Sequence, residues 1–200
     1  DRNKGWQMSP PPLYLEGVKV QTPWLYNFLK NPTQIRHTTV LRMPKFNMSD
    51  DEARALANYF AAVDGAEFPY QRIPEREASY LSEMALTNPD YQKNAWTMMN
   101  SALCTKCHAI GGREYVSKDP KDIRGPNFVN VADRLRPEWV KLWILHPNWI
   151  TPYTSMPVNF EKGKPKADLF GGDGLKQVTA IRDSLMNYHR LMETIGKLSD

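Results

Sequence analysis

A short stretch near the middle of the 200-residue chain limits its fold more than any other: Cys104-Thr105-Lys106-Cys107-His108. Two cysteines separated by two residues and followed directly by a histidine form the pattern to which a c-type haem is attached. Residues three apart on a helical turn face the same side, so both sulfurs can reach one edge of a porphyrin. His108 can then supply the proximal nitrogen to the iron. The motif predicts one covalent haem c, bound through Cys104 and Cys107.

Two other interpretations of the cysteine pair compete with this one. A closed zinc site needs four ligands, but the chain has no further cysteine, and its other histidines, His37, His146 and His189, are scattered. A thioredoxin-type dithiol is expected in a strand–helix–strand context, whereas the segment before this motif is polar and helix-like. The residues therefore favour haem over zinc or dithiol chemistry.

The pattern of the chain predicts a mainly α fold. No alternating apolar–polar strand pattern recurs, and 16 prolines predict long irregular connections between short helices. No apolar run reaches eighteen residues, which predicts no transmembrane segment. The net charge of +4 could steer the protein toward acidic redox partners. Without dense clusters of lysine and arginine, the chain is not expected to bind nucleic acid. The first residues lack a basic stretch followed by an apolar one, which we interpret as a mature or trimmed start.

Local signals predict where the helices lie. Helices are expected over residues 21–31, 49–63, 75–86, 91–104, 137–146 and 176–195, and residues 1–22 are expected to be mostly loop. Ser49 and Glu52 form a capping-box pair, Asp90 is the predicted cap of helix 91–104, and Pro137 suits a first helical turn. The helix that Pro137 begins is predicted to bury Trp139, Leu142, Trp143 and Leu145.

The chain also repeats itself. Trp24-Leu25 and Phe28-Leu29 correspond to Trp139-Val140 and Trp143-Ile144, 115 positions later, and Met43-Pro44 corresponds to Met156-Pro157, 113 positions later. Each half then ends in an amphipathic helix, carrying Tyr59-Phe60 or Tyr188-His189. The counterpart of the haem histidine would fall before the first residue, so the first half lacks a haem-attachment part. That part is either absent by evolution or lies on another polypeptide or a removed segment; chance similarity is the alternative.

Residues from about 90 to 200 resemble a class I-type bacterial cytochrome c domain. The resemblance rests on the Cys-X-X-Cys-His motif, then Gly125-Pro126-Asn127-Phe128, a tryptophan-containing helix, Met156-Pro157 and a C-terminal helix, in that order. It implies a cytochrome c-like helical fold with long proline- and glycine-rich loops. Residues 1–66 are similar to part of such a domain without its own attachment motif, and 67–89 are a predicted linker. The arrangement is similar to tandem cytochrome modules of respiratory complexes.

The resemblance implies a methionine as the second axial ligand of the iron. Met156 lies 48 residues beyond His108 in a predicted loop, with Pro157 stiffening the chain behind it. His146 and His189 are rival ligands, and a bis-histidine iron would have a lower potential than a His/Met iron. Core packing is the alternative role of Met156, because a thioether is a common core filler.

Further residues receive roles from the same resemblance. Pro126 is implied to offer its carbonyl to the other ring nitrogen of His108, which fixes the ring and tunes the metal. Trp139 and Arg134 are candidates for contacts to the haem propionates, with Arg136 next, because a buried carboxylate needs donors or positive charge. Met43 could ligate a second haem held by a partner chain, or it could be a leftover loop methionine.

The resulting functional hypothesis is one-electron transfer by a His/Met-ligated haem, not enzymatic catalysis. The expected partners are redox proteins, namely other subunits of a respiratory complex. The expected location is the periplasm or another extracytoplasmic compartment, with association to a membrane complex as one option. Two alternatives stay open: a haem enzyme of peroxidase or nitrogen-oxide type, and a haem-based gas sensor. Both would need Met156 to be displaceable from the iron.

Overall fold

The computed structural model describes residues 2–36, 39, 41–111 and 124–195, and these residues form helices and irregular chain with no named strand. The mainly α class is thus confirmed. The α-helices are α1 (Arg2–Met8), α2 (Glu16–Lys19), α3 (Thr22–Lys30), α4 (Asp50–Val63), α5 (Ala78–Thr87), α6 (Tyr91–Met99), α7 (Ala102–Thr105), α8 (Val131–Arg134), α9 (Pro137–Leu145), α10 (Pro147–Ile150), α11 (Gly174–Met186) and α12 (Tyr188–Ile195). Short 3-10 turns are η1 (Pro74–Arg76), η2 (Phe128–Asn130), η3 (Glu161–Gly163) and η4 (Phe170–Gly172).

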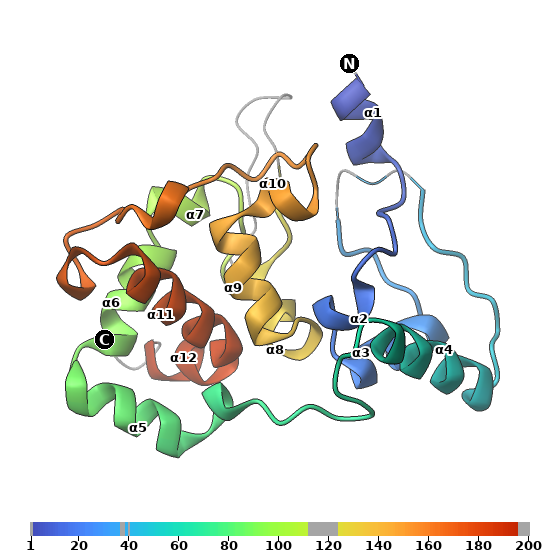
Figure 1. Ribbon diagram of the computed structural model, residues 1–200, viewed down its shortest axis with the longest axis horizontal. Helices are drawn as coiled ribbons and strands as arrows, with labels where there is room; N and C mark the ends of the chain where they lie inside the picture. Colours follow the sequence, from blue (N-terminus) through green and yellow to red (C-terminus); the bar gives the residue numbers. More distant parts are fainter. Residues whose placement is uncertain (1, 37–38, 40, 112–123, 196–200) are drawn as a thin grey trace.

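The helices gather into two groups that meet along α8 and α9. Helices α2, α3 and α4 pack together at one end, drawn in blue to teal in Figure 1. Helices α5 to α12 form the other end, where α11 packs against α6, α8 and α9. The chain between α4 and α5 runs along the outside from one group to the other (Figure 1). The two groups are therefore joined side by side.

Several helix boundaries follow from local chemistry, as predicted. The Ser49 side chain accepts from the main-chain nitrogen of Glu52, and the Glu52 carboxylate accepts from the main-chain nitrogen of Ser49, which completes the capping box of α4. Pro137 is the first residue of α9. Asp90 is the N-cap residue of α6, as predicted, but its side chain makes no capping hydrogen bond.

Other predictions fail where tertiary contacts or side chains interrupt a helix. The helix expected over 91–104 is two helices, because the Ser101 hydroxyl accepts from the Leu103 main-chain nitrogen and begins α7 anew. The helix expected over 176–195 breaks at Asn187, whose side-chain amide donates to the carbonyls of Asp183 and Glu75. The segment 1–22, expected to be mostly loop, contains α1 and α2. Leu142, expected to be buried, is 38% exposed.

The 115-residue offset read from the sequence recurs in the helix bounds. Helices α2 and α8, and likewise α3 and α9, begin and end at positions 115 apart. Each long helix of the repeat carries a stacked aromatic pair: the ring centroids of Trp24 and Phe28 are 4.9 Å apart, and those of Trp139 and Trp143 are 5.0 Å apart. Helix α3 packs on α4, as α9 packs on α11. Both halves therefore use the same helix arrangement.

The halves join through equivalent residues. Val20 and Leu135, which are 115 positions apart, form an isolated antiparallel bridge. Two main-chain hydrogen bonds flank the bridge, from Gln21 N to Arg134 O (2.8 Å) and from Arg136 N to Lys19 O (2.9 Å). Two side-chain hydrogen bonds follow the same pattern, because Gln21 Nε2 donates to the Leu135 carbonyl (2.8 Å) and Arg136 Nε donates to the Val20 carbonyl (2.9 Å). Each bond has a counterpart with the roles of the halves exchanged. The junction thus has the pattern of a local two-fold axis.

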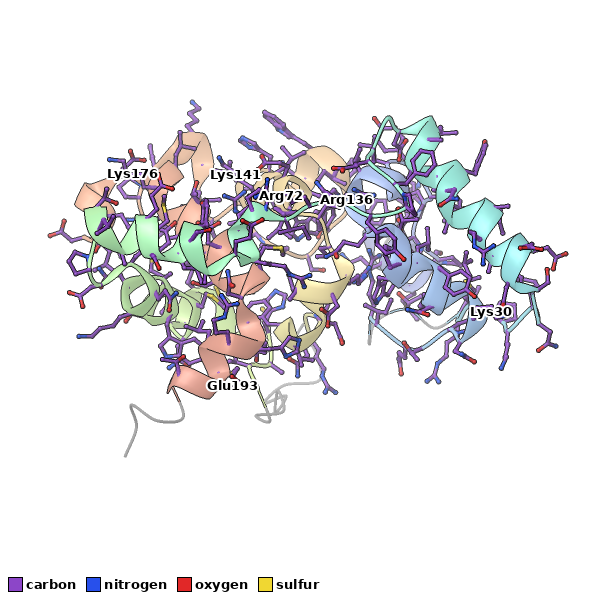
Figure 2. The ribbon with its side chains drawn as sticks, turned by 90° about the horizontal axis from the view of Figure 1, so that it is seen from below. Lys30, Arg72, Arg136, Lys141, Lys176 and Glu193 are labelled. Carbon is purple, nitrogen blue, oxygen red and sulfur yellow. The ribbon has the colours of Figure 1, made fainter. Side chains whose placement is uncertain are left out.

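A continuous apolar core crosses this junction. Its members from the first half include Leu25, Leu29 and Ala57, and those from the second include Trp139, Val178 and Leu185. Arg136 reinforces the same junction, because its guanidinium also donates to Thr22 Oγ1, Gln71 Oε1 and the Glu67 carbonyl. Figure 2 shows Arg136 between the two groups of helices. Burial of this core is the main force that holds the halves together.

Candidate functional site

The Cys-X-X-Cys-His motif lies on and just after α7. The main-chain nitrogens of Cys107 and His108 both donate to the Cys104 carbonyl, at 3.1 and 2.9 Å, so the chain keeps turning through the histidine. Both thiols are free and half-buried. Burial, and then the neighbouring Cys107, raise the pKa of the Cys104 thiol to about 11. The Cys104 thiol is therefore protonated at neutral pH.

The imidazole of His108 is held on two sides. Its Nδ1 lies 2.8 Å from the Pro126 carbonyl oxygen, and its ring stacks on Phe128 with centroids 4.6 Å apart and planes 22° apart. Because a carbonyl oxygen can only accept, Nδ1 carries the hydrogen and Nε2 keeps its lone pair for a metal. Burial lowers the pKa of His108, which keeps the ring neutral. The hydrogen bond that the resemblance implies between Pro126 and His108 is thus present.

Gly125 has no side chain, and the His108 ring occupies the space that a side chain at this position would fill. A Cβ at position 125 would lie 2.6 Å from both Cε1 and Nδ1 of His108, well inside van der Waals contact. The Gly125 nitrogen also donates to the Cys107 carbonyl at 2.7 Å, which ties the two segments together. Neither Gly125 nor Phe128 is predicted from the sequence to have a role at the site. The position of the glycine directly before Pro126 is the sequence signal that could have indicated one.

Two buried donors of the second half have no acceptor among the described residues: Trp139 Nε1 and Arg134 Nε. Both belong to the residues predicted to contact haem propionates. A buried donor without a partner destabilises a fold by about 1–3 kcal/mol, so a bound carboxylate would remove an existing penalty. Arg136, in contrast, directs its guanidinium into the junction between the halves.

Met156 lies on the loop between α10 and η3, half-buried. Its main-chain nitrogen is 3.2 Å from Thr154 Oγ1, and the loop is tied to α1 because Gln7 donates to the Tyr153 carbonyl and accepts from the Ser155 hydroxyl. The half-buried apolar side chains that pack on the main core include Met43 but not Met156. The Met156 thioether is therefore not committed to the protein core.

The rival histidine ligands already have protein contacts. The His146 ring stacks on Trp149 with centroids 3.7 Å apart. His189 is 56% exposed at its side chain and lies 3.4 Å from Asp133. His37 lies outside the described residues. Within the described part of the chain, no three His, Cys, Asp or Glu side chains gather into a group that could hold a metal ion.

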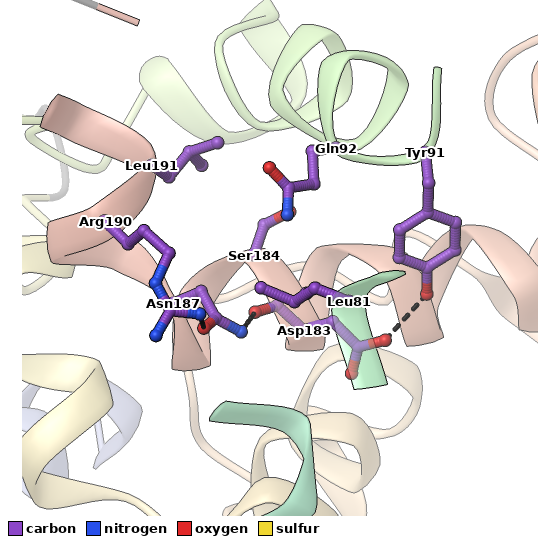
Figure 3. Close-up of a pocket in the computed structure, with 8 residues that line it drawn as sticks. All are labelled: Leu81, Tyr91, Gln92, Asp183, Ser184, Asn187, Arg190 and Leu191. Atoms are coloured by element: carbon purple, nitrogen blue, oxygen red, sulfur yellow. Dashed lines mark hydrogen bonds between the residues drawn. The ribbon is translucent and has the colours of Figure 1, made fainter. Parts of the chain in front are cut away.

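A small cavity between α5, α6, α11 and α12 is a separate feature. Leu81, Tyr91, Asp183 and Asn187 are among the residues that line it (Figure 3). Its volume of about 10 Å³ is the space of roughly one water molecule. None of the residues predicted to bind haem lines it, so it belongs to the packing of the helices.

The structure brings Cys107, His108 and Pro126 together, and the residues predicted to hold a haem have, as a set, the chemistry that a covalently attached haem needs. Two thiols on one turn, a neutral histidine with a free Nε2, a methionine outside the core and two unpaired donors are the groups that such a cofactor engages. No protein-family model, curated protein or solved structure matches the chain. Among the described helices, none has the length and apolar character needed to cross a membrane.

Proposed function

We propose that this protein transfers single electrons through a haem bound covalently to Cys104 and Cys107, with His108 and Met156 as axial ligands. The observation that carries the proposal is the setting of His108. Its Nδ1 is engaged by the Pro126 carbonyl at 2.8 Å, directly after a pair of half-buried cysteines, which leaves Nε2 available. Haem supplies the one-electron iron couple when bound.

The chain's own residues set the conditions for that couple. The Pro126 carbonyl fixes the ring of His108 and raises its basicity, as partners of metal-bound histidines do. Met156 would be the second ligand of the iron, and a thioether ligand raises the potential relative to a second histidine. With protein ligands on both faces, no position is left for a substrate, which favours electron transfer over peroxidase or nitrogen-oxide chemistry and over gas sensing.

The same proposal extends to location and partners. Covalent haem attachment implies an extracytoplasmic compartment, the periplasm in a bacterium. The exchange surface would be the haem edge near the two cysteines. The partners would be other redox subunits of a respiratory complex, docked through the first half of the chain.

An experiment on the intact protein tests the proposal. Acidified organic solvent extracts non-covalent haem but leaves covalent haem on the chain, and an intact mass reports one haem per chain. Cys107→Ala should leave a single thioether or lose the haem. Complete extraction of the colour from wild type would contradict the proposal.

The ligand assignment has a separate test. Met156→Ala should remove the long-wavelength absorption band of sulfur-ligated ferric haem and lower the midpoint potential, while Met48→Ala, which changes a core methionine, should change neither. Rapid binding of carbon monoxide to the reduced wild-type protein at neutral pH would instead favour sensing or catalysis.

A further inference from the structure

The last residues of α2 and α8 are basic, equivalent in the repeat and buried. Lys19 is 7% exposed and Arg134 is 9% exposed. The guanidinium carbon of Arg134 lies 5.1 Å from the centroid of the Trp24 ring, so a residue of the second half packs on an aromatic ring of the first. No hydrogen bond or ion pair engages the Arg134 side chain within the described residues, and its Nε is fully enclosed.

A third cation joins these two. Main-chain hydrogen bonds from Gln21 to Arg134 and from Arg136 to Lys19 hold the ends of α2 and α8 beside each other, and the charges of Arg36 and Glu16 act on both Lys19 and Arg134. The charge of Tyr153, on the loop that carries Met156, acts in turn on Arg36.

The charges in this cluster do not balance. Glu16 is the one carboxylate among the four groups and pairs with Lys19 at 2.5 Å, which leaves two cations without a counter-charge in the part of the chain that the structure describes. Burial first, and repulsion by the neighbouring cations, lower the pKa of Lys19 to about 8 and that of Arg134 to about 10. A buried cation without a counter-ion is strongly unfavourable, so the site is built for a ligand that carries about two negative charges.

We propose that Lys19 and Arg36 of the first half, together with Arg134 of the second, receive the two carboxylates of the haem attached to Cys104 and Cys107. The inference rests on the proposed function and adds to it. The first half would complete the haem pocket of the second and set its potential. The unpaired Trp139 Nε1 on α9, the helix that follows α8, would donate to the same carboxylates.

The two-fold pattern of the junction supports this assignment. Arg134 at the end of α8 packs on Trp24 of α3, and α2, which ends at the equivalent residue Lys19, packs in the same way against α9, which carries Trp139. Lys19 and Arg36 are positioning residues, because they would act on the iron only through the haem carboxylates. Removal of a nearby cation disfavours the reduced iron, which carries one positive charge fewer, so the midpoint potential should fall.

The test compares midpoint potentials of haem-loaded variants by spectroelectrochemistry. Lys19→Met should lower the equilibrium constant for reduction about tenfold, which is about 59 mV for a one-electron couple. Lys19→Arg should restore it. Lys176→Met is the matched control, because it removes the same charge from an exposed side chain at the end of the molecule remote from α2 (Figure 2). Arg36→Met, on a half-buried loop residue, gives a second measurement if Lys19→Met fails to fold.

Five results would overturn the inference. Equal shifts in Lys19→Met and Lys176→Met would mean that Lys19 has only a structural role or a long-range effect. A shift seen only in preparations with two irons per chain would assign the cluster to a second haem near Met43. A shift that disappears when inorganic phosphate is removed would assign it to an anion from solution. A wild-type protein without covalent haem overturns the proposed function and this inference together, whereas an unchanged potential overturns this inference alone.

Discussion

Replacement of Gly125 by alanine tests how tightly the chain holds His108. The added Cβ would lie 2.6 Å from two ring atoms, whereas ordinary contact begins at 3.4 Å, so the ring or the main chain must move by about 0.8 Å. The ring has little room to retreat, since Pro126 holds Nδ1 at 2.8 Å and Phe128 stacks on its face. Gly125 has no positive φ, so steric overlap is the main effect of the substitution.

The expected destabilisation combines two contributions. Overpacking of a well-packed site costs about 1–3 kcal/mol, and a weakened hydrogen bond between His108 and Pro126 costs about 0.5–1.5 kcal/mol. The sum, about 2–4 kcal/mol, lowers the Tm of a chain of this size by roughly 4–16 °C. The displaced ring should also change the absorption spectrum of the bound haem, because it reorients the iron ligand.

Thermal unfolding of the haem-loaded protein, followed by circular dichroism, measures the effect. Gly5→Ala is the matched control, because a Cβ at position 5 meets no atom within 4 Å and the residue has no positive φ. The control should keep its Tm within about 2 °C of wild type. If Gly125→Ala behaved like Gly5→Ala and kept the wild-type spectrum, the proposed steric role of Gly125 would be refuted.

Three further outcomes are expected. Arg136→Met leaves two carbonyl acceptors at the junction without their donor. The substitution should lower the free energy of unfolding, measured by urea titration, by roughly 3–5 kcal/mol. A loss below about 1 kcal/mol would contradict the two-fold junction. Tyr91→Phe should cost about 1–2 kcal/mol, because Tyr91 donates to Asp183 at 2.7 Å while Tyr80 still donates at 2.9 Å. Burial, and then Asp183, raise the pKa of Tyr80 to about 12 and that of Tyr91 further, so stability should fall as pH rises above about 10. In Tyr91→Phe, the free energy of unfolding should decrease less steeply as pH rises above about 10.

Local chemistry predicted the features that depend on neighbours in sequence. The capping box of Ser49 and Glu52 and the start of α9 at Pro137 arise from groups within one helical turn. The break at Asn187 could not be found in this way, because its side chain donates to the Glu75 carbonyl, 112 positions away. The amphipathic pattern continues through that break and so predicts one helix.

The candidate site likewise has parts that the sequence predicts and parts that depend on the folded chain. The motif gives the order of the cysteines and His108, and the resemblance gives Pro126 a role. The cation cluster of Lys19, Arg36 and Arg134 depends on how two distant segments meet, and no local pattern reports it. The repeat was visible in the sequence, but the two-fold pairing that places Lys19 beside Arg134 exists only in the folded chain.

A last prediction uses the difference between the two halves. The sequence Leu-Ala-Asn-Tyr at 56–59 matches Leu-Met-Asn-Tyr at 185–188. Leu185 and Tyr188 are 5% and 1% exposed, since α6 and other elements cover α11, whereas Leu56 and Tyr59 are 38% and 59% exposed. Within the described residues, no counterpart of α6 packs on this face of α4.

The same substitution should therefore have unequal effects at the two positions. Leu185→Ala should lower the free energy of unfolding by about 2–5 kcal/mol, because it leaves a cavity in the core. Leu56→Ala should change it by about 0.5 kcal/mol or less, because the side chain already contacts water. Urea titrations at several protein concentrations compare the pair. A large loss of unfolding free energy in Leu56→Ala that grows with protein concentration would contradict this expectation. It would mean that this face of α4, which is exposed in the single chain, is buried against another copy of the protein in solution.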